Sequence, residues 1–185
     1  MSTVSRPAEL TGDYVFDTAR TRIAFVARHT LSTRVRGRFE EFSGGAHLDG
    51  DRPSESRAWL TIRATSIRTG NRQRDKLLRD KFLDVDGHPT LTFTSTRVVP
   101  VDEARYQVTG DLDVRGVSRP VTLDAVLTGS ESDARGDLRV AFRGGATIDR
   151  EDWGVNWNAS TTLMIAPKVL LEFDVTATRE AQCAS

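Results

Sequence analysis

Apolar and polar residues alternate along most of this chain. The clearest example is residues 22–29, where Ile23, Phe25, Ala27 and His29 occupy every second position. A two-residue period predicts a β-strand, because successive side chains of a strand point to opposite faces. The same period predicts strands at residues 14–17, 34–43, 57–66, 90–99, 105–115, 120–128, 137–148 and 168–178, with a further short strand at 161–165.

One stretch departs from this period and predicts a helix at about residues 71–84. Leu78 and Phe82 lie four positions apart there, and Asn71 can cap the first turn. A parallel sheet would need several such helices as crossovers, whereas an antiparallel sheet needs none. We therefore predict an all-β fold, a closed antiparallel barrel of about eight strands with this single helical insertion. A β-sandwich is the alternative architecture.

The composition argues against a nucleic-acid-binding protein and against a disulfide-bonded one. Lys+Arg and Asp+Glu both total 26, so the formal net charge is zero and we expect no nucleic-acid partner. The single cysteine, Cys183, excludes an internal disulfide.

The chain also lacks the sequence signals of export and of membrane insertion. No apolar run approaches the roughly 18 residues of a membrane span, so we expect no integral membrane segment. The polar segment 1–11 has no apolar core of the kind that signal peptides carry. We expect a cytoplasmic protein with a disordered leader at residues 1–12, one barrel domain at 13–179 and a tail at 180–185.

Many of the residues on the predicted inward faces are small, although phenylalanines are mixed with them. The small residues include Ala27, Gly37, Ala58, Ala64, Ser95, Gly110, Ala125, Gly144, Ala146 and Ala177. Unfilled volume in a core costs ~24 cal/mol per Å³, unless an apolar ligand occupies it. Two interpretations stay open: the barrel encloses a ligand cavity, or its interior is filled by the helix or by Trp153 and Trp157.

Few residues suggest catalysis. His29 continues an inward apolar face, where it is either a hydrogen-bonded structural residue or a polar contact for a ligand. The three histidines lack metal-ligand spacing, and there is no cysteine cluster, so we predict no metal site and no cofactor. The sequence also lacks a nucleophile elbow, a P-loop and a dinucleotide fingerprint.

Basic residues crowd the start of the predicted helix. They are Arg68, Arg72, Arg74, Lys76 and Arg79. They form either an ordinary solvated helix face or a cationic rim at the barrel mouth, which would suit a phosphate or carboxylate head group.

Four segments resemble the YceI-like family of polyisoprenoid-binding, lipocalin-like proteins, in the same order across residues 14–178. They lie at residues 25–39, 81–96, 110–121 and 148–154. The most specific is 110–121, GDLDVRGVSRPV, which resembles the family's strand-turn-strand signature. The segment 148–154 departs from the family pattern, because Asp149 stands where Asn is usual and Trp153 where Phe is usual.

The resemblance implies an eight-stranded barrel around a long apolar tunnel that holds an isoprenoid chain or another long amphiphile. Many members are periplasmic, whereas this sequence resembles a cytoplasmic relative. Family members are often dimeric, so a homodimer is a possible assembly. The family offers no agreed catalytic residues to carry over.

We therefore predict a non-enzymatic protein that binds, stores or transports a long-chain isoprenoid or similar amphiphilic lipid. The expected ligand-binding residues are Phe25, His29, Phe39, Leu60, Phe93, Leu112, Leu123, Phe142 and Phe173. The alternative is an enzyme, an isomerase or cyclase acting on a bound isoprenoid-like lipid, with His29 as its base.

Overall fold

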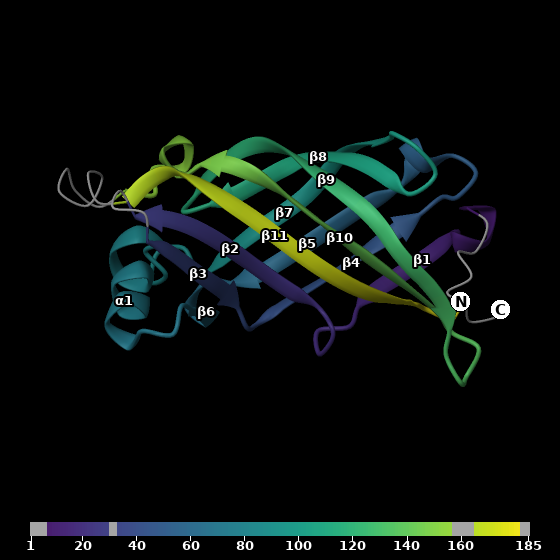
Figure 1. The fold of residues 1–185 in the computed structure, drawn as a ribbon, viewed down its shortest axis with the longest axis horizontal. Helices are drawn as coiled ribbons and strands as arrows, with labels where there is room; N and C mark the ends of the chain where they lie inside the picture. Colours follow the sequence, from purple (N-terminus) through teal and green to yellow (C-terminus); the bar gives the residue numbers. More distant parts are fainter. Residues whose placement is uncertain (1–6, 30–32, 157–164, 182–185) are drawn as a thin grey trace.

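The protein folds as one antiparallel sheet that curls around a central axis (Figure 1). The computed structural model describes residues 7–29, 33–156 and 165–181. Its strands are β1 Gly12–Phe16, β2 Arg22–His29, β3 Arg34–Phe39, β4 Phe42–Leu48, β5 Arg57–Arg63, β6 Ile67–Arg68, β7 Thr90–Pro100, β8 Arg105–Val114, β9 Val117–Ser132, β10 Leu138–Asp149 and β11 Ile165–Arg179. Its helical segments are η1 Pro7–Leu10, η2 Pro53–Glu55, η3 Ala64–Ser66, α1 Arg72–Leu77, η4 Leu78–Phe82 and η5 Arg150–Trp153.

The sheet closes into a barrel. Neighbouring strands pair in the order β1-β4-β5-β7-β8-β9-β10-β11, and β11 pairs back to β1. This confirms the predicted closed eight-stranded antiparallel barrel and excludes the sandwich. Closure leaves no free edge around this ring, because every strand in it has a partner on both sides.

Three of the eight strands are interrupted. β11 pairs with β2 along its first part and with β1 at its C-terminal end, so β1 and β2 are two halves of one strand. In the same way β3 continues as β4, and β5 continues as β6. The predicted continuous strands at 34–43 and 57–66 are therefore wrong in detail: one breaks at residues 40–41 and the other at η3.

A change of parity explains the interruptions. In β3 the inward residues are odd-numbered, as in Phe39, whereas in β4 they are even-numbered, as in Phe42. Ile62 of β5 and Ile67 of β6 differ in the same way. A regular strand cannot keep both sets inside, because a shift of one residue exchanges its two faces. Each break shifts the alternation by one residue, so that the apolar side chains on both sides of the break face the interior.

The predicted helical insertion is present as α1 and the π-helical turn η4. Asn71 caps it, with its side-chain oxygen accepting a hydrogen bond from the Arg74 backbone nitrogen at 3.0 Å. Buried Asp75 accepts hydrogen bonds from the backbone nitrogen and the hydroxyl of Thr69, which fixes the turn before the helix. None of the helices in the described ranges is long and apolar enough to cross a membrane.

The helix stands at a gap in the barrel wall. Beyond the Arg63–Thr90 pair of β5 and β7, the described strands no longer join on this side, because β6 pairs there with β3 alone. Figure 1 shows α1 beside β3 and β6, at the end of the barrel where β2 ends and β11 begins. We call this the α1 end and the opposite one the η1 end.

The η1 end has its own small apolar cluster. Leu10 of η1 is buried there against Tyr14 and Val140. The Tyr14 hydroxyl donates a hydrogen bond of 2.8 Å to the Leu10 carbonyl oxygen. Residues 7–10 of the segment expected to be a disordered leader therefore form an ordered turn, because Leu10 supplies an apolar side chain that the barrel end buries. The division into leader, barrel domain and tail otherwise stays a prediction.

Candidate ligand cavity

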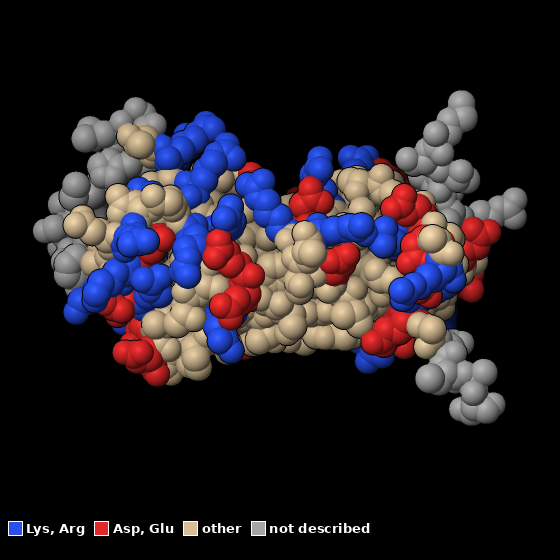
Figure 2. Space-filling model, turned by 90° about the horizontal axis from the view of Figure 1, so that it is seen from below, with Lys and Arg blue, Asp and Glu red and all other residues tan. Residues whose placement is uncertain are grey.

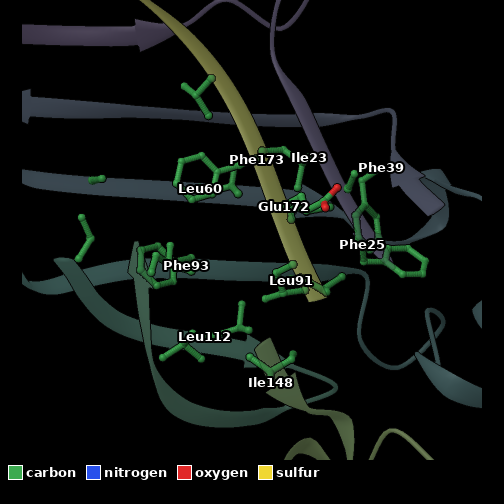
Figure 3. Close-up of a pocket in the computed structure, with 18 of the residues that line it drawn as sticks. Ile23, Phe25, Phe39, Leu60, Leu91, Phe93, Leu112, Ile148, Glu172 and Phe173 are labelled. Carbon is green, nitrogen blue, oxygen red and sulfur yellow. The ribbon is translucent and has the colours of Figure 1, made fainter. Parts of the chain in front are cut away.

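The barrel encloses a cavity of about 540 Å³. Its wall extends from Pro7 and Leu10 at the η1 end to Leu77, Leu78 and Arg28 at the α1 end, so the cavity runs along the barrel. Figure 3 shows its central part, where apolar side chains from β2, β5, β7, β8 and β11 face one another. The volume lies in the range of about 300–1,000 Å³ that is typical of small-molecule sites.

Glycines in the wall explain why the interior is hollow. Three phenylalanine rings lie over glycines of a neighbouring strand: Phe25 over Gly37, Phe93 over Gly110 and Phe173 over Gly144. A Cβ atom added at Gly110 would stand 2.5 Å from the Phe93 ring, and one at Gly37 would overlap the Phe25 ring. The rings therefore lie against the wall instead of filling the centre.

The structure places eight of the nine predicted ligand-binding residues on the cavity wall. They are Phe25, Phe39, Leu60, Phe93, Leu112, Leu123, Phe142 and Phe173. The rings of Phe25 and Phe39 pack against each other with centroids 5.9 Å apart. A role of these residues in binding stays a prediction. His29 is the last residue of β2, and its side chain lies outside the part of the chain that the structure describes.

The helix and Trp153 belong to the wall and do not fill the interior. Trp153 is 3% exposed, and its indole nitrogen donates a hydrogen bond of 2.8 Å to the Leu112 carbonyl oxygen. From the helical insertion, Leu78 and Phe82 line the cavity. The open volume beside them contradicts a core plugged by the helix or by Trp153, while Trp157 lies outside the described residues.

Sequence reasoning missed the contribution of the helix to the site. Leu78 and Phe82 form an apolar stripe in the sequence, but the stripe alone does not show whether the helix packs on the outer face of the barrel or against its interior. It also missed Arg28, Arg150 and Glu172, which border the cavity although strand alternation or charge would place them outside (Figure 3 labels Glu172).

Tyr106 is a polar residue of the cavity wall near the η1 end. Its ring packs edge-on against Phe142, with centroids 6.3 Å apart. Burial raises the pKa of the Tyr106 hydroxyl, and the negative charge of Asp102 raises it further. The phenol therefore stays protonated at neutral pH and is a hydrogen-bond partner, not a base. Within the described residues, no group of three or more His, Cys, Asp or Glu could hold a metal ion.

A closed antiparallel barrel around an apolar cavity defines a barrel of the small-ligand-binding type. The model of the YceI-like domain matches residues 14–177, so the chain belongs to the YceI-like family. This confirms the resemblance seen in the four sequence segments.

Two relatives illustrate the sequence similarity. A UPF0312 protein of Pectobacterium carotovorum is 36% identical over 154 residues, which cover 82% of this chain and 80% of the relative. A UPF0312 protein of Pseudomonas paraeruginosa is 37% identical over 134 residues, covering 72% and 70% of the two chains.

Solved structures share the fold. Burkholderia cenocepacia BcnA superposes with a TM-score of 0.79 at 24% identity, over 88% of this chain and 99% of BcnA. The YceI protein of Campylobacter jejuni gives 0.72 at 27% identity, over 80% and 87%. A polyisoprenoid-binding domain from Saccharophagus degradans gives 0.72 at 19% identity, over 90% and 98%.

Proposed function

We propose that this protein binds a long-chain isoprenoid or a similar amphiphilic lipid in its cavity, and that it stores or transports that lipid. The observation that carries the proposal is the cavity itself, about 540 Å³ of elongated space with an almost wholly apolar wall. The fold that the chain shares with a polyisoprenoid-binding domain supports it.

The physical chemistry of the wall favours a hydrocarbon chain as the guest. Each buried CH₂ group contributes ~0.8 kcal/mol, and part of that gain offsets the loss of freedom of the guest on binding. A chain gains more from this space than water does, because water needs two to four polar partners that an apolar wall does not offer.

Binding fits the wall better than turnover does. An isomerase or cyclase needs an acid or base held beside the guest by a positioned partner. Tyr106 stays protonated, and its hydroxyl donates to the Glu103 carbonyl oxygen at 3.5 Å. The enzyme alternative places its base at His29, and its test is whether His29→Ala abolishes turnover of a bound lipid. A cytoplasmic location and a homodimer stay predictions.

The proposal is tested by blocking the cavity from one strand. Ala125 of β9 is 7% exposed and lines the cavity, whereas its neighbour Val126 is 37% exposed on the outer face. We expect Ala125→Trp to abolish binding of a polyisoprenol, because the indole occupies the space of the chain. The matched control Val126→Trp adds the same side chain outside and should bind normally.

Two measurements decide the outcome. Mass spectrometry of an organic extract identifies any lipid that copurifies with the native protein, and titration with a polyisoprenol gives the affinity of each variant. Circular dichroism establishes that both variants are folded. Equal affinity of folded Ala125→Trp and the wild type would refute the cavity as the lipid site.

A further inference from the structure

The charged residues of the cavity wall are distributed unevenly between its two ends. At the α1 end the wall includes Arg28 from β2, Arg74 from α1 and Arg150 from η5. At the η1 end it includes one cation and one anion, Arg57 and Asp49. The α1 end is therefore cationic and the η1 end is close to neutral.

The acid that borders the cavity lies away from this cluster. Glu172 pairs across the sheet with Ala24, four residues along β2 from Arg28. At the rise of a strand this separation is ~13 Å. Among the described residues of the wall, this acid is therefore not adjacent to Arg28 along the strand pair.

Two of the three arginines are fixed by hydrogen bonds. Arg74 donates from Nε to the Thr69 hydroxyl and from Nη2 to the Thr69 carbonyl oxygen, both at 2.8 Å. Arg150 is 5% exposed and donates from Nη1 to the Val155 carbonyl oxygen at 2.6 Å. Fixed donors lose little freedom when an anion binds, which favours recognition by arginine.

The strands beside the mouth carry further positive charge. Residues 18–39 contain six arginines, of which Arg20 forms an ion pair with Asp17 and Arg38 with Glu40. Arg28 lies directly opposite Arg34 in the β2–β3 register, with Arg36 two positions further along β3. These three arginines are exposed on the outer face, because the inward residues of β3 are odd-numbered, and they add positive charge beside the mouth. Figure 2 shows Lys and Arg side chains gathered over this end of the molecule.

We propose that the α1 end of the cavity binds an anionic head group, a phosphate, diphosphate or carboxylate, while the hydrocarbon tail of the guest extends toward the η1 end. This inference rests on the proposed function and adds to it the charge and the orientation of the lipid. Arginine suits such head groups because its planar fork of donors matches a carboxylate or a phosphate.

A pair of ligands with one tail and two heads tests the proposal. Farnesyl phosphate and farnesol share the same chain, and only the first carries negative charge. We expect the wild type to bind farnesyl phosphate about tenfold more tightly, which corresponds to ~1.4 kcal/mol. Raising the salt concentration should reduce this advantage, because salt screens charges at an exposed mouth.

Single substitutions then test whether the preference for farnesyl phosphate depends on the arginines at the α1 end of the cavity. Arg28→Gln, at an exposed position, should lower the affinity for farnesyl phosphate several-fold and leave the affinity for farnesol unchanged. Arg74→Gln should act in the same direction, and its farnesol affinity reports whether α1 is intact. The control Arg97→Gln makes the same charge change at an exposed position of β7 outside the cavity, and should alter neither affinity.

The outcomes separate this proposal from the one on which it depends. Failure of the wild type to bind either ligand would overturn lipid binding itself. Equal affinity for the two ligands, unchanged by Arg28→Gln, would overturn the head-group site. The proposal that the cavity binds a lipid would be unaffected by that result. Binding of inorganic phosphate as tight as that of farnesyl phosphate would also overturn it, because the site would then recognise a free ion and not a lipid head.

Discussion

The substitution Gly37→Ala tests whether glycines in the wall keep the interior hollow. Gly37 lies directly opposite Phe25, and a Cβ atom at this position would overlap three atoms of the Phe25 ring. The ring must then leave the wall and crowd Phe39, whose ring centroid is 5.9 Å away. Overpacking of this kind costs ~1–3 kcal/mol, and in a domain of this size each kcal/mol lowers Tm by ~2–4 °C.

Gly129 of β9 provides the matched control. A Cβ atom there would have no neighbour within 4 Å, and neither glycine has a positive φ angle. Gly129→Ala should leave stability unchanged or raise it by ~0.5–1 kcal/mol, because alanine loses less backbone entropy on folding. Chemical denaturation of both variants gives the two free energies of unfolding.

A double-mutant cycle identifies the cause. In a Phe25→Leu background the large ring is gone, so the cost of Gly37→Ala should fall to within ~0.5 kcal/mol of zero. Two results would mean that the glycine does not seat the ring. One is that Gly37→Ala is as harmless as Gly129→Ala, and the other is that its cost is the same with and without Phe25.

Two further predictions concern stability. Trp153→Phe keeps the aromatic packing but removes the donor to the Leu112 carbonyl oxygen, and should lower the free energy of unfolding by ~1–3 kcal/mol in urea denaturation; an unchanged midpoint would show that the bond is not needed. Asp133 accepts hydrogen bonds from the backbone nitrogens of Arg135 and Asp137, which hold its pKa below the ordinary 3.8. A lowered folded-state pKa stabilises the protein above the unfolded-state value, and this contribution is lost as pH falls through the folded-state value. Asp133→Asn should therefore lose less stability than the wild type on acidification from about pH 5 to pH 2, measured by thermal unfolding, and parallel curves would exclude this role.

Much of the fold could be predicted from side-chain alternation. Strand β2 begins and ends where the pattern places it, and Gly37 and Ala125 do face the interior as their periodicity requires. The strand breaks were missed although their signal is local: Phe39 and Phe42 are both apolar and three positions apart, which no uninterrupted strand can bury on one face. Periodicity alone does not show which of two such residues the chain will place inside the barrel.

The charged part of the site could not be predicted in the same way. Arg28 and Arg150 are distant in sequence, and they border one cavity only because β2 and β10 both end at the α1 end of the barrel. Their joint position depends on closure of the sheet, which no short segment encodes. The cluster around Arg74 was visible in the sequence, but whether it faces solvent or the cavity depends on how α1 packs.

At one place in the barrel wall α1 stands where a strand partner would be, and this affects how a ligand could enter and leave the cavity. Everywhere else around the ring, widening the barrel means breaking a ladder of backbone hydrogen bonds. Between β6 and β7 the described strands are not paired, and the helical insertion contributes Leu77, Leu78 and Phe82 to the cavity wall. A swing of this one segment would expose the interior sideways while every rung of the ladder stays intact. Loading and release therefore need not compete with the stability of the barrel, and slow hydrogen exchange in the strands is compatible with fast exchange of lipid.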